Sequence, residues 1–216
     1  MSMNLEGILE PSQDRSRIQG VMVGIVTNNQ DPDGLARVKL TFPWRGATDE
    51  SNWARVAVPG GGKERGIYFL PEVGDEVLVA FENGDLNHPY VLGSLWNGKD
   101  APPSSNDDGS NNKRVIKSRS GHEIVLDDTD GKENITIKSK DGQTITLIDG
   151  SGGPKLEFMD SSGNSIVIDG AGSEIAVKSS QKVTIQSSMV QIEADASMTL
   201  KSGGTLKIQG AVVQIN

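Results

Sequence analysis

The second half of the chain repeats a short alternation of apolar and polar residues, from about Glu123 to the end. Typical units read "NITIKS" (134–139), "TITLID" (144–149) and "SIVIDG" (165–170), and each runs into a turn. Alternation with a period of two indicates a β-strand that turns one row of side chains inward. Each unit has only two or three apolar side chains, which is too few to bury a core. The units must therefore pack against other units.

The spacing of the units shortens along the chain, from about 11 residues to 7 or 8 near the C-terminus. A single-chain parallel β-helix fits this poorly, because stacked coils keep a constant length. An open meander would leave one apolar face and two strand edges exposed. We therefore expect three identical chains wound into a triangular prism, with apolar rows meeting on the threefold axis and backbone partners coming partly from neighbouring chains. The predicted trimer core is the second apolar residue of each unit: Leu126, Ile137, Leu147, Phe158, Ile168, Val177, Ile185, Ile192, Leu200, Ile208 and Ile215.

The first half has a different pattern, with longer and irregularly spaced β-rich segments and no helical period. Five strands in so short a stretch, with turns such as "DPDG" between them, indicate a small closed barrel of the oligonucleotide/oligosaccharide-binding (OB) kind. The fold class is all-β. The predicted organisation is an N-terminal arm (1–17), the OB-fold-like barrel (18–97), a Pro/Ser/Asn/Gly-rich linker (98–113) and an intertwined trimeric β-helical needle (114–216).

Bulk composition excludes several classes of function. The net charge of −8 and the pI near 4.8 oppose general nucleic-acid binding. The chain has no cysteine, so neither disulfides nor thiolate metal sites are available. No apolar run approaches the roughly 20 residues that span a bilayer. The N-terminal sequence lacks the apolar core of a signal peptide, so we expect synthesis in the cytoplasm before assembly.

One stretch carries a specific resemblance. Residues 70–98, "LPEVGDEVLVAFENGDLNHPYVLGSLWNG", together with "GIVTNNQDPDGLARVKLTFPW" and "SNWARVAVPGGG", resemble phage baseplate assembly protein V and the barrel-plus-needle part of type VI secretion spike proteins. The resemblance implies a homotrimeric central spike of a contractile tail or injection particle. In such a spike the barrels form a collar, and the needle perforates the target membrane when the sheath contracts. Larger relatives carry a hub domain before the barrel, whereas only about 19 residues precede it here, so we expect the hub to be a separate protein.

The C-terminus departs from one known form of this family. Some phage needles end in a His-x-His motif that binds iron, whereas this chain ends in "TLKIQGAVVQIN". We therefore expect no iron and no other cofactor. Val213 and Ile215 near a blunt apolar end, together with Asn216, instead suggest a docking platform for a tip protein of the Pro-Ala-Ala-Arg (PAAR) repeat kind.

No catalytic residues are predicted, and the chain is expected not to be an enzyme. Glycoside hydrolysis needs two carboxylates across a cleft, and the linker offers only the adjacent Asp107 and Asp108. The calcium-like turn at Asp128, Asp130 and Glu133 lacks a full ligand loop. The remaining motifs are interpreted structurally: turn or strand-start positions for His88 and His122, a barrel loop for Gly60–Lys63, and core or interface packing for Trp44, Trp53 and Trp96.

Two other functions stay open on the sequence. One is a trimeric glycan-binding adhesin, in which the barrel grips sugar and the repeats form a fibrous stalk. The other is a polysaccharide lyase on a parallel β-helix, which the shrinking period and the absence of clustered charged residues disfavour.

Overall fold

The computed structural model describes residues 17–46 and 49–215, and it is all-β. The chain divides into two compact units, Met1–Ser105 and Asn106–Asn216. Two features expected from the sequence, the N-terminal arm apart from Arg17 and the docking residue Asn216, fall outside the described residues.

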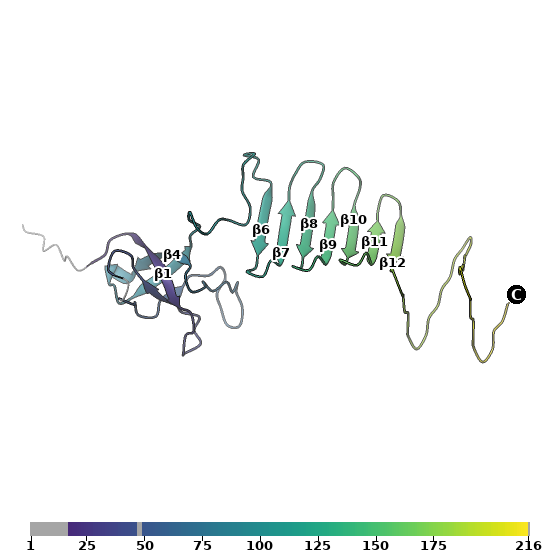
Figure 1. Ribbon diagram of the computed structural model, residues 1–216, viewed down its shortest axis with the longest axis horizontal. Helices are drawn as coiled ribbons and strands as arrows, with labels where there is room; N and C mark the ends of the chain where they lie inside the picture. Colours follow the sequence, from purple (N-terminus) through teal and green to yellow (C-terminus); the bar gives the residue numbers. More distant parts are fainter. Residues whose placement is uncertain (1–16, 47–48, 216) are drawn as a thin grey trace, which may run out of the picture. The chain divides into compact units, whose positions relative to one another are not determined.

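The first unit is a five-stranded barrel. Its strands alternate inward apolar residues with outward residues, as a half-buried strand does. The strands are β1 (Val21–Asn28), β2 (Lys39–Thr41), β3 (Arg55–Val56), β4 (Glu76–Phe81) and β5 (Pro89–Ser94), and a short 3₁₀ turn, η1 (Glu82–Gly84), follows β4. All five lie within the segments expected from the sequence, and Figure 1 labels β1 and β4 among them.

The strand order is β2-β1-β4-β5-β3, and bonds between the two outer strands close the sheet. Val38 and Ala54 exchange backbone hydrogen bonds of 3.0 and 2.7 Å, and Ser51 N donates to Leu40 O at 2.7 Å. β3 runs parallel to β5, whereas the other pairs are antiparallel. Closure in this order gives the barrel the topology of an OB fold and removes its free edges.

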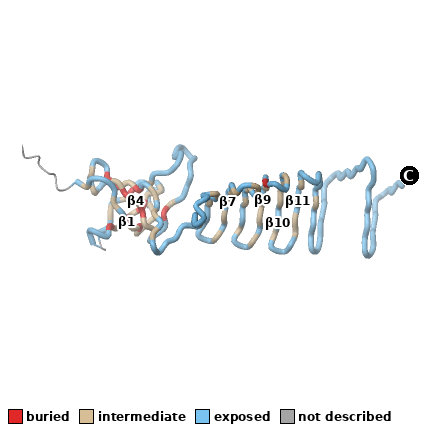
Figure 2. The backbone as a smooth tube through the Cα atoms, turned by 90° about the horizontal axis from the view of Figure 1, so that it is seen from above, coloured by how far each residue is buried: buried red, intermediate tan, exposed pale blue. Residues whose placement is uncertain are grey.

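The barrel holds the buried core of the protein (Figure 2). Its members come from β1, β2, β4 and β5 and from residues that flank β2 and β3. Gly24 lets β1 approach this core, because a Cβ there would lie 3.2 Å from Val79 Cγ2 and 3.3 Å from Phe42 Cε1. The buried apolar residues are Val26, Val38, Leu40, Phe42, Ala54, Val77, Val79, Phe81 and Val91.

The turn between β1 and β2 is organised by Asp31. Its carboxylate accepts hydrogen bonds from the backbone N–H groups of Asp33, Leu35 and Arg37 at 3.0–3.2 Å. Arg37 Nε and Nη2 add two more, at 2.8 and 2.6 Å. These bonds to the charged form hold the pKa of Asp31 well below its usual range, with the Arg37 guanidinium as the largest cause.

The second unit contains a seven-stranded sheet whose strands follow one another in chain order, each antiparallel to the next (Figure 1). Every strand has five residues, and four to six residues connect each pair. The strands are β6 (Lys113–Lys117), β7 (Glu123–Asp127), β8 (Asn134–Lys138), β9 (Thr144–Ile148), β10 (Lys155–Met159), β11 (Ser165–Asp169) and β12 (Glu174–Lys178).

Alternate connections, which lie on the same side at the ends of the strands, are bonded to one another. Asp149 N donates to Glu133 O at 2.9 Å, and Ser151 N donates to Gly131 O at 3.0 Å. Gly150 makes this approach possible, since a Cβ there would lie 2.6 Å from the Gly131 carbonyl oxygen. Backbone bonding therefore continues beyond the strands into the turns.

After β12 the pattern of pairing changes. Residues 179–215 contain no strand, and their side chains are exposed throughout, in a chain that reverses direction without pairing to itself (Figures 1 and 2). The apolar–polar alternation nevertheless continues to the end of this segment.

The strand topology corrects one expectation from the sequence. The repeat pattern disfavours a meander and favours backbone partners that come partly from neighbouring chains. Through Lys178, however, every strand pairs within its own chain, because connections of four to six residues are long enough for an antiparallel return. The exposed apolar face, which was the reason for disfavouring a meander, is present and uncovered.

Candidate assembly interface

One face of the seven-stranded sheet is almost entirely apolar. Residues directly opposite one another across antiparallel strands point to the same face, so the register defines that face. Ile124 lies opposite Ile137, and Leu126 lies opposite Ile135. Extended across the sheet, this gives two columns of side chains, which we call the apolar face: Ile116, Ile124, Leu126, Ile135, Ile137, Ile145, Leu147, Leu156, Phe158, Ile166, Ile168, Ile175 and Val177.

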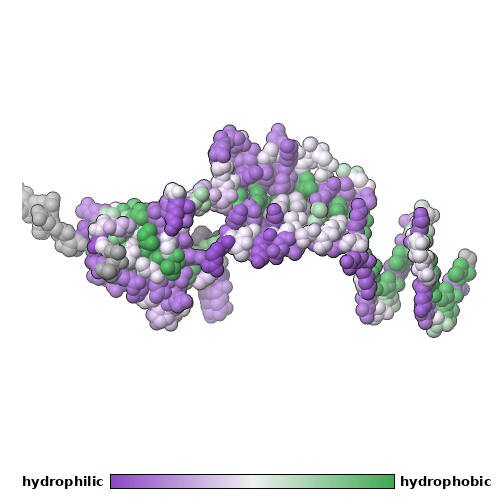
Figure 3. Space-filling view, viewed as in Figure 1, coloured by the Kyte–Doolittle hydropathy of each residue, from purple (hydrophilic) through white to green (hydrophobic). Residues whose placement is uncertain are grey.

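These side chains remain largely uncovered. Leu126, Ile137 and Ile168 are 40%, 44% and 40% exposed, and Ile175 at the last strand reaches 72%. In the space-filling view, apolar residues are scattered among polar ones over the sheet and form longer stretches along the segment that follows it (Figure 3). An apolar face of this extent is unusual on a soluble monomer and marks an interaction surface.

The opposite face is mixed and carries the charge pairs. Lys155 Nζ lies 3.5 Å from the Asp169 carboxylate and 3.9 Å from that of Glu157. Lys155 also helps to hold the pKa of Asp169 below its ordinary value, after the larger effect of the Gly172 N–H. These side chains are partly exposed, and surface pairs of this kind contribute little to stability. This face is suited to water, and the apolar face is not.

The structure places the core residues expected from the sequence on this surface. Leu126, Ile137, Leu147, Phe158, Ile168 and Val177 all lie on the apolar face, alternating between its two columns. Ile185, Ile192, Leu200, Ile208 and Ile215 lie in the segment after β12 and are exposed.

The expected core residues are only half of the apolar face. They comprise one apolar residue from each unit, whereas Ile124, Ile135, Ile145, Leu156, Ile166 and Ile175 face the same way. Residues two apart on a strand share a face, so the same alternation already contained them.

The polar turns singled out in the sequence have protein partners. Asp128 pairs with Arg114 at 3.2 Å, and Glu133 Oε1 accepts a hydrogen bond from Gly131 N at 3.1 Å. His88 Nδ1 lies 3.1 Å from Asp85 Oδ2 in the turn before β5. His122 Nδ1 accepts a hydrogen bond from Lys140 N at 3.3 Å, so it links the β6–β7 connection to the β8–β9 connection.

The three tryptophans have separate surroundings in the barrel. Trp53 lies beneath Arg37 and Lys39, whose cationic groups are 5.9 and 5.6 Å from its ring. Trp44 packs against the core residue Phe42 with 5.7 Å between ring centroids, and Trp96 is 69% exposed. They do not form one stacking surface.

Two other kinds of site are absent from the described ranges, 17–46 and 49–215. These residues contain no cluster of three or more His, Cys, Asp or Glu side chains positioned to hold a metal ion. Nor is there a helix long and apolar enough to cross a membrane in this part of the chain.

Comparison with known proteins gives the relatives of the barrel. Residues 22–96 match the family model of the type VI secretion system/phage-baseplate injector OB domain. The barrel is thus similar to an injector OB domain, over about a third of the chain. The resemblance to the baseplate and spike family is thereby confirmed. Three proteins are similar to this chain over more residues than the barrel contains.

The type VI secretion system spike protein VgrG5 of Pseudomonas aeruginosa is 33% identical over 135 residues, which are 56% of this chain and 17% of that protein. VgrG2a of the same organism is 31% identical over 127 residues, 53% of this chain and 15% of its own length. The actin cross-linking toxin VgrG1 of Vibrio cholerae is 29% identical over 136 residues, 57% of this chain and 12% of the toxin. The matched part is thus less than a fifth of each relative.

Proposed function

We propose that this chain is a non-catalytic central spike of a contractile tail or injection baseplate, and that it acts as a homotrimer. The apolar face of β6–β12 is the observation that carries the proposal, because a sheet with such a face requires a covering partner. Three copies related by a threefold axis cover one another's faces and form a closed prism without further components.

The energetics favour such an association. Completing the burial of a half-exposed Ile or Leu contributes roughly 1 kcal/mol, so the apolar face contributes on the order of 10 kcal/mol per chain. Association costs about 4–15 kcal/mol. Burial of the sheet's apolar face alone therefore roughly offsets the cost of association. Burial of the apolar residues after β12 adds the net stabilisation.

Residues 179–215 fit an intertwined arrangement in which strand partners come from other copies. Units here recur every 7 or 8 residues, which leaves two or three residues for a turn after a five-residue strand. Short hairpin turns need Gly, Asn or Asp at positions of positive φ, and residues 179–181 are Ser-Ser-Gln. A return at this point would also set Lys182 opposite Lys178, and like charges facing each other are destabilising.

An intertwined prism suits a device that transmits compressive force. No chain in it unfolds without separating from two others, and its backbone bonds repeat along its length. In this proposal the sheath supplies the work, a separate hub protein holds the barrels, and a PAAR-like tip protein docks on the end that includes Val213, Ile215 and Asn216. The needle then makes transient contact with the target membrane and pierces it.

Mass and shape in solution test the proposal together. The full chain is expected to sediment as three copies and to appear in electron micrographs as a rod attached to globular domains. A glycan array gives the competing outcome: a trimer that binds sugar tightly through its barrel supports the adhesin. A folded single subunit contradicts both.

A further inference from the structure

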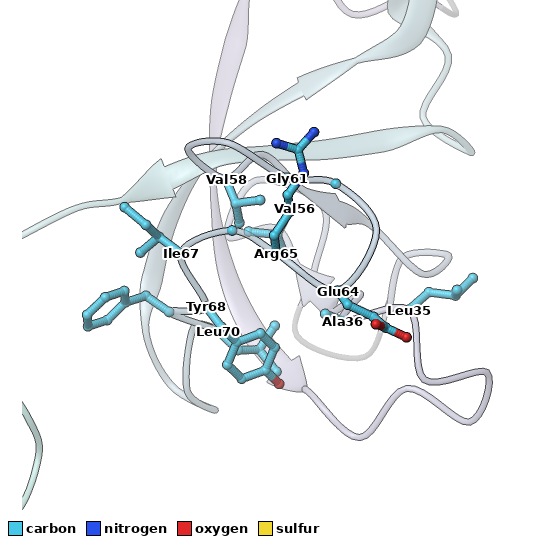
Figure 4. A pocket seen from close by; sticks show the side chains of 13 residues that line it. Leu35, Ala36, Val56, Val58, Gly61, Glu64, Arg65, Ile67, Tyr68 and Leu70 are labelled. Atoms are coloured by element: carbon cyan, nitrogen blue, oxygen red, sulfur yellow. The ribbon is translucent and has the colours of Figure 1, made fainter.

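Apolar side chains of the barrel line a hollow of about 420 Å³ beside the long loop after β3. Leu35 approaches this hollow from the segment before β2, and Val58 and Ile67 approach it from the loop (Figure 4). The lining also includes both Glu64 and Arg65, so its charge does not select one kind of partner. The two polar edges of the seven-stranded sheet, in contrast, complement each other.

The face that carries the apolar columns continues past the strands into polar residues. Around β7, His122 and Asp128 are exposed together with the two apolar residues between them, and the intervening residues are half-buried. The backbone ladder continues by one residue at each end, since Ser118 N donates to His122 O at 2.8 Å and Asp128 N donates to Asn112 O at 2.9 Å. His122 and Asp128 therefore lie on the apolar side of the sheet, at opposite ends of one strand.

One edge of this face, which we call the carboxylate edge, carries Asp128, Glu133 and Asp149 at the ends of β7, β8 and β9. Asp149 N donates to Glu133 O at 2.9 Å, so these residues keep the register of the strands. Asp128 lies 3.2 Å from Arg114, and Glu133 Oε1 accepts a hydrogen bond from Gly131 N at 3.1 Å. An ionised carboxylate accepts about four hydrogen bonds and donates none, so this edge offers acceptors.

The other edge, which we call the donor edge, carries His122, Ser139 and Gln143 at the opposite ends of the same three strands. His122 Nδ1 accepts a hydrogen bond from Lys140 N at 3.3 Å, so the hydrogen of the neutral ring lies on Nε2. Ser139 Oγ donates to Gln143 Oε1, so the group that Gln143 offers to a further partner is its amide nitrogen. This edge therefore offers donors.

The two edges match strand by strand. No strand of β6–β12 has a carboxylate at both ends of this face. Where the donor edge does carry a carboxylate, Asp160 after β10, the residue at the other end of the strand is Pro154. Like charges that face each other are destabilising, and this distribution lets the two edges meet without such a pair.

We propose that the carboxylate edge of one copy meets the donor edge of the next, with His122 Nε2 donating to Asp128 and the Gln143 amide nitrogen donating to Asp149 of the neighbouring copy. Rotation about a threefold axis brings one edge of each sheet to the opposite edge of the next sheet at the same height. The inference rests on the trimeric spike proposed above and names the residues that join its copies.

Such a seam sets the register of the three chains. The apolar columns repeat from strand to strand, so burial alone changes little if one copy slips along the axis. A slip by one strand would set Asp160 of one copy against Asp149 of the next and replace a donor–acceptor pair by two like charges. Polar groups within an apolar interface fix the register in the same way in coiled coils.

Paired cysteines in the otherwise cysteine-free full chain test the seam. A chain carrying both His122→Cys and Asp128→Cys is expected to give covalent trimers under mild oxidation, seen on a non-reducing denaturing gel. The two positions lie about 20 Å apart on one extended strand. Disulfides need Cα atoms within about 7 Å, so every bridge joins two copies.

The matched control carries Glu123→Cys and Asp127→Cys, at the two ends of the same strand but on the opposite face. This control and the two single variants, His122→Cys and Asp128→Cys, are expected to run as single chains. Equal cross-linking of the control pair would show random collision and overturn the seam. Cross-linking of a single variant would show that like edges meet, which also overturns it.

The remaining outcomes separate this inference from the spike proposal. A trimeric mass without covalent trimers in the double variant overturns the seam and leaves the spike proposal standing. Covalent dimers as the end product show a twofold pairing of sheets and overturn both. A monomeric mass for the unmodified chain overturns the spike proposal itself.

Discussion

Ile137 lies directly opposite Ile124 across β7 and β8, and both side chains stay uncovered, at 44% and 36% exposure. Cross-strand pairs of this kind stabilise a sheet most when a second layer covers them. In the described chain no second layer lies on the apolar face, and in the proposed trimer other copies supply one.

A charge on the apolar face is expected to abolish assembly. In the proposed trimer, Leu147→Lys places an ammonium group where three apolar faces meet, and burying an unpaired charge costs several kcal/mol. Thr146→Lys is the matched control, because Thr146 lies on the opposite face directly across from Glu157. Sedimentation is expected to show a dissociated or aggregated Leu147→Lys chain and an unchanged Thr146→Lys trimer. Equal behaviour of the two variants would count against a buried apolar face.

Amide hydrogen exchange is expected to reveal pairing after β12. Residues 179–215 have no strand partner in their own chain, so their N–H groups exchange rapidly unless other copies bond them. We predict protection of this segment in the native protein and loss of it in Leu147→Lys. Rapid exchange of the segment in an intact trimer would refute the intertwined arrangement.

Gly150→Ala is expected to weaken the contact between two connections of the sheet. The new Cβ would stand 2.6 Å from the Gly131 carbonyl oxygen, so the two connections must separate. Overpacking of this kind costs about 1–3 kcal/mol. Gly152→Ala is the control, since nothing lies within 4 Å of its Cβ position. Chemical denaturation followed by circular dichroism measures both, and equal midpoints would show that the close approach is unimportant.

Asp31→Asn is expected to destabilise the barrel in a pH-dependent way. The folded-state pKa of Asp31 lies below the ordinary aspartate value of about 3.9, so its carboxylate stabilises the fold above that pH. This contribution is lost as the pH falls further, through the folded-state pKa. The variant should therefore be less stable than the parent at pH 7, and the difference should shrink below about pH 4.

Tryptophan fluorescence measures this effect, because all three tryptophans lie in the barrel. Asp100→Asn serves as the control, since Asp100 is exposed and its hydrogen bonds with Asn97 are made by its backbone N–H and carbonyl groups. A stability difference between the parent and Asp31→Asn that stays constant from pH 7 to pH 3 would show that the Arg37 contact is not responsible.

The sequence predicted the barrel well, because its signals are local. Alternation in "DEVLVAFENGD" corresponds to β4 and its inward row Val77, Val79 and Phe81, and the Asp31 turn separates β1 from β2. Closure between Val38 and Ala54 is a long-range contact, and only the likeness to an OB fold indicated it.

The repeats were predicted as strands but not as a meander. Whether a strand pairs with the preceding strand of its own chain depends on the length and chemistry of the connection. The meander was instead disfavoured because it would leave an apolar face exposed. Residues 170–173 suffice for the return between β11 and β12, but the Ser-Ser-Gln of 179–181 is followed by no strand. The shorter spacing of the units near Lys178 is visible in the sequence. Only the strand pairing in the structure shows that pairing within the chain ends there.

The mass of the full chain in solution, measured by light scattering at micromolar concentration, tests the trimeric spike most directly. We predict a particle of three times the 23.0 kDa chain mass that persists on dilution. A soluble 23.0 kDa subunit with β6–β12 folded and the apolar face open to water would contradict it.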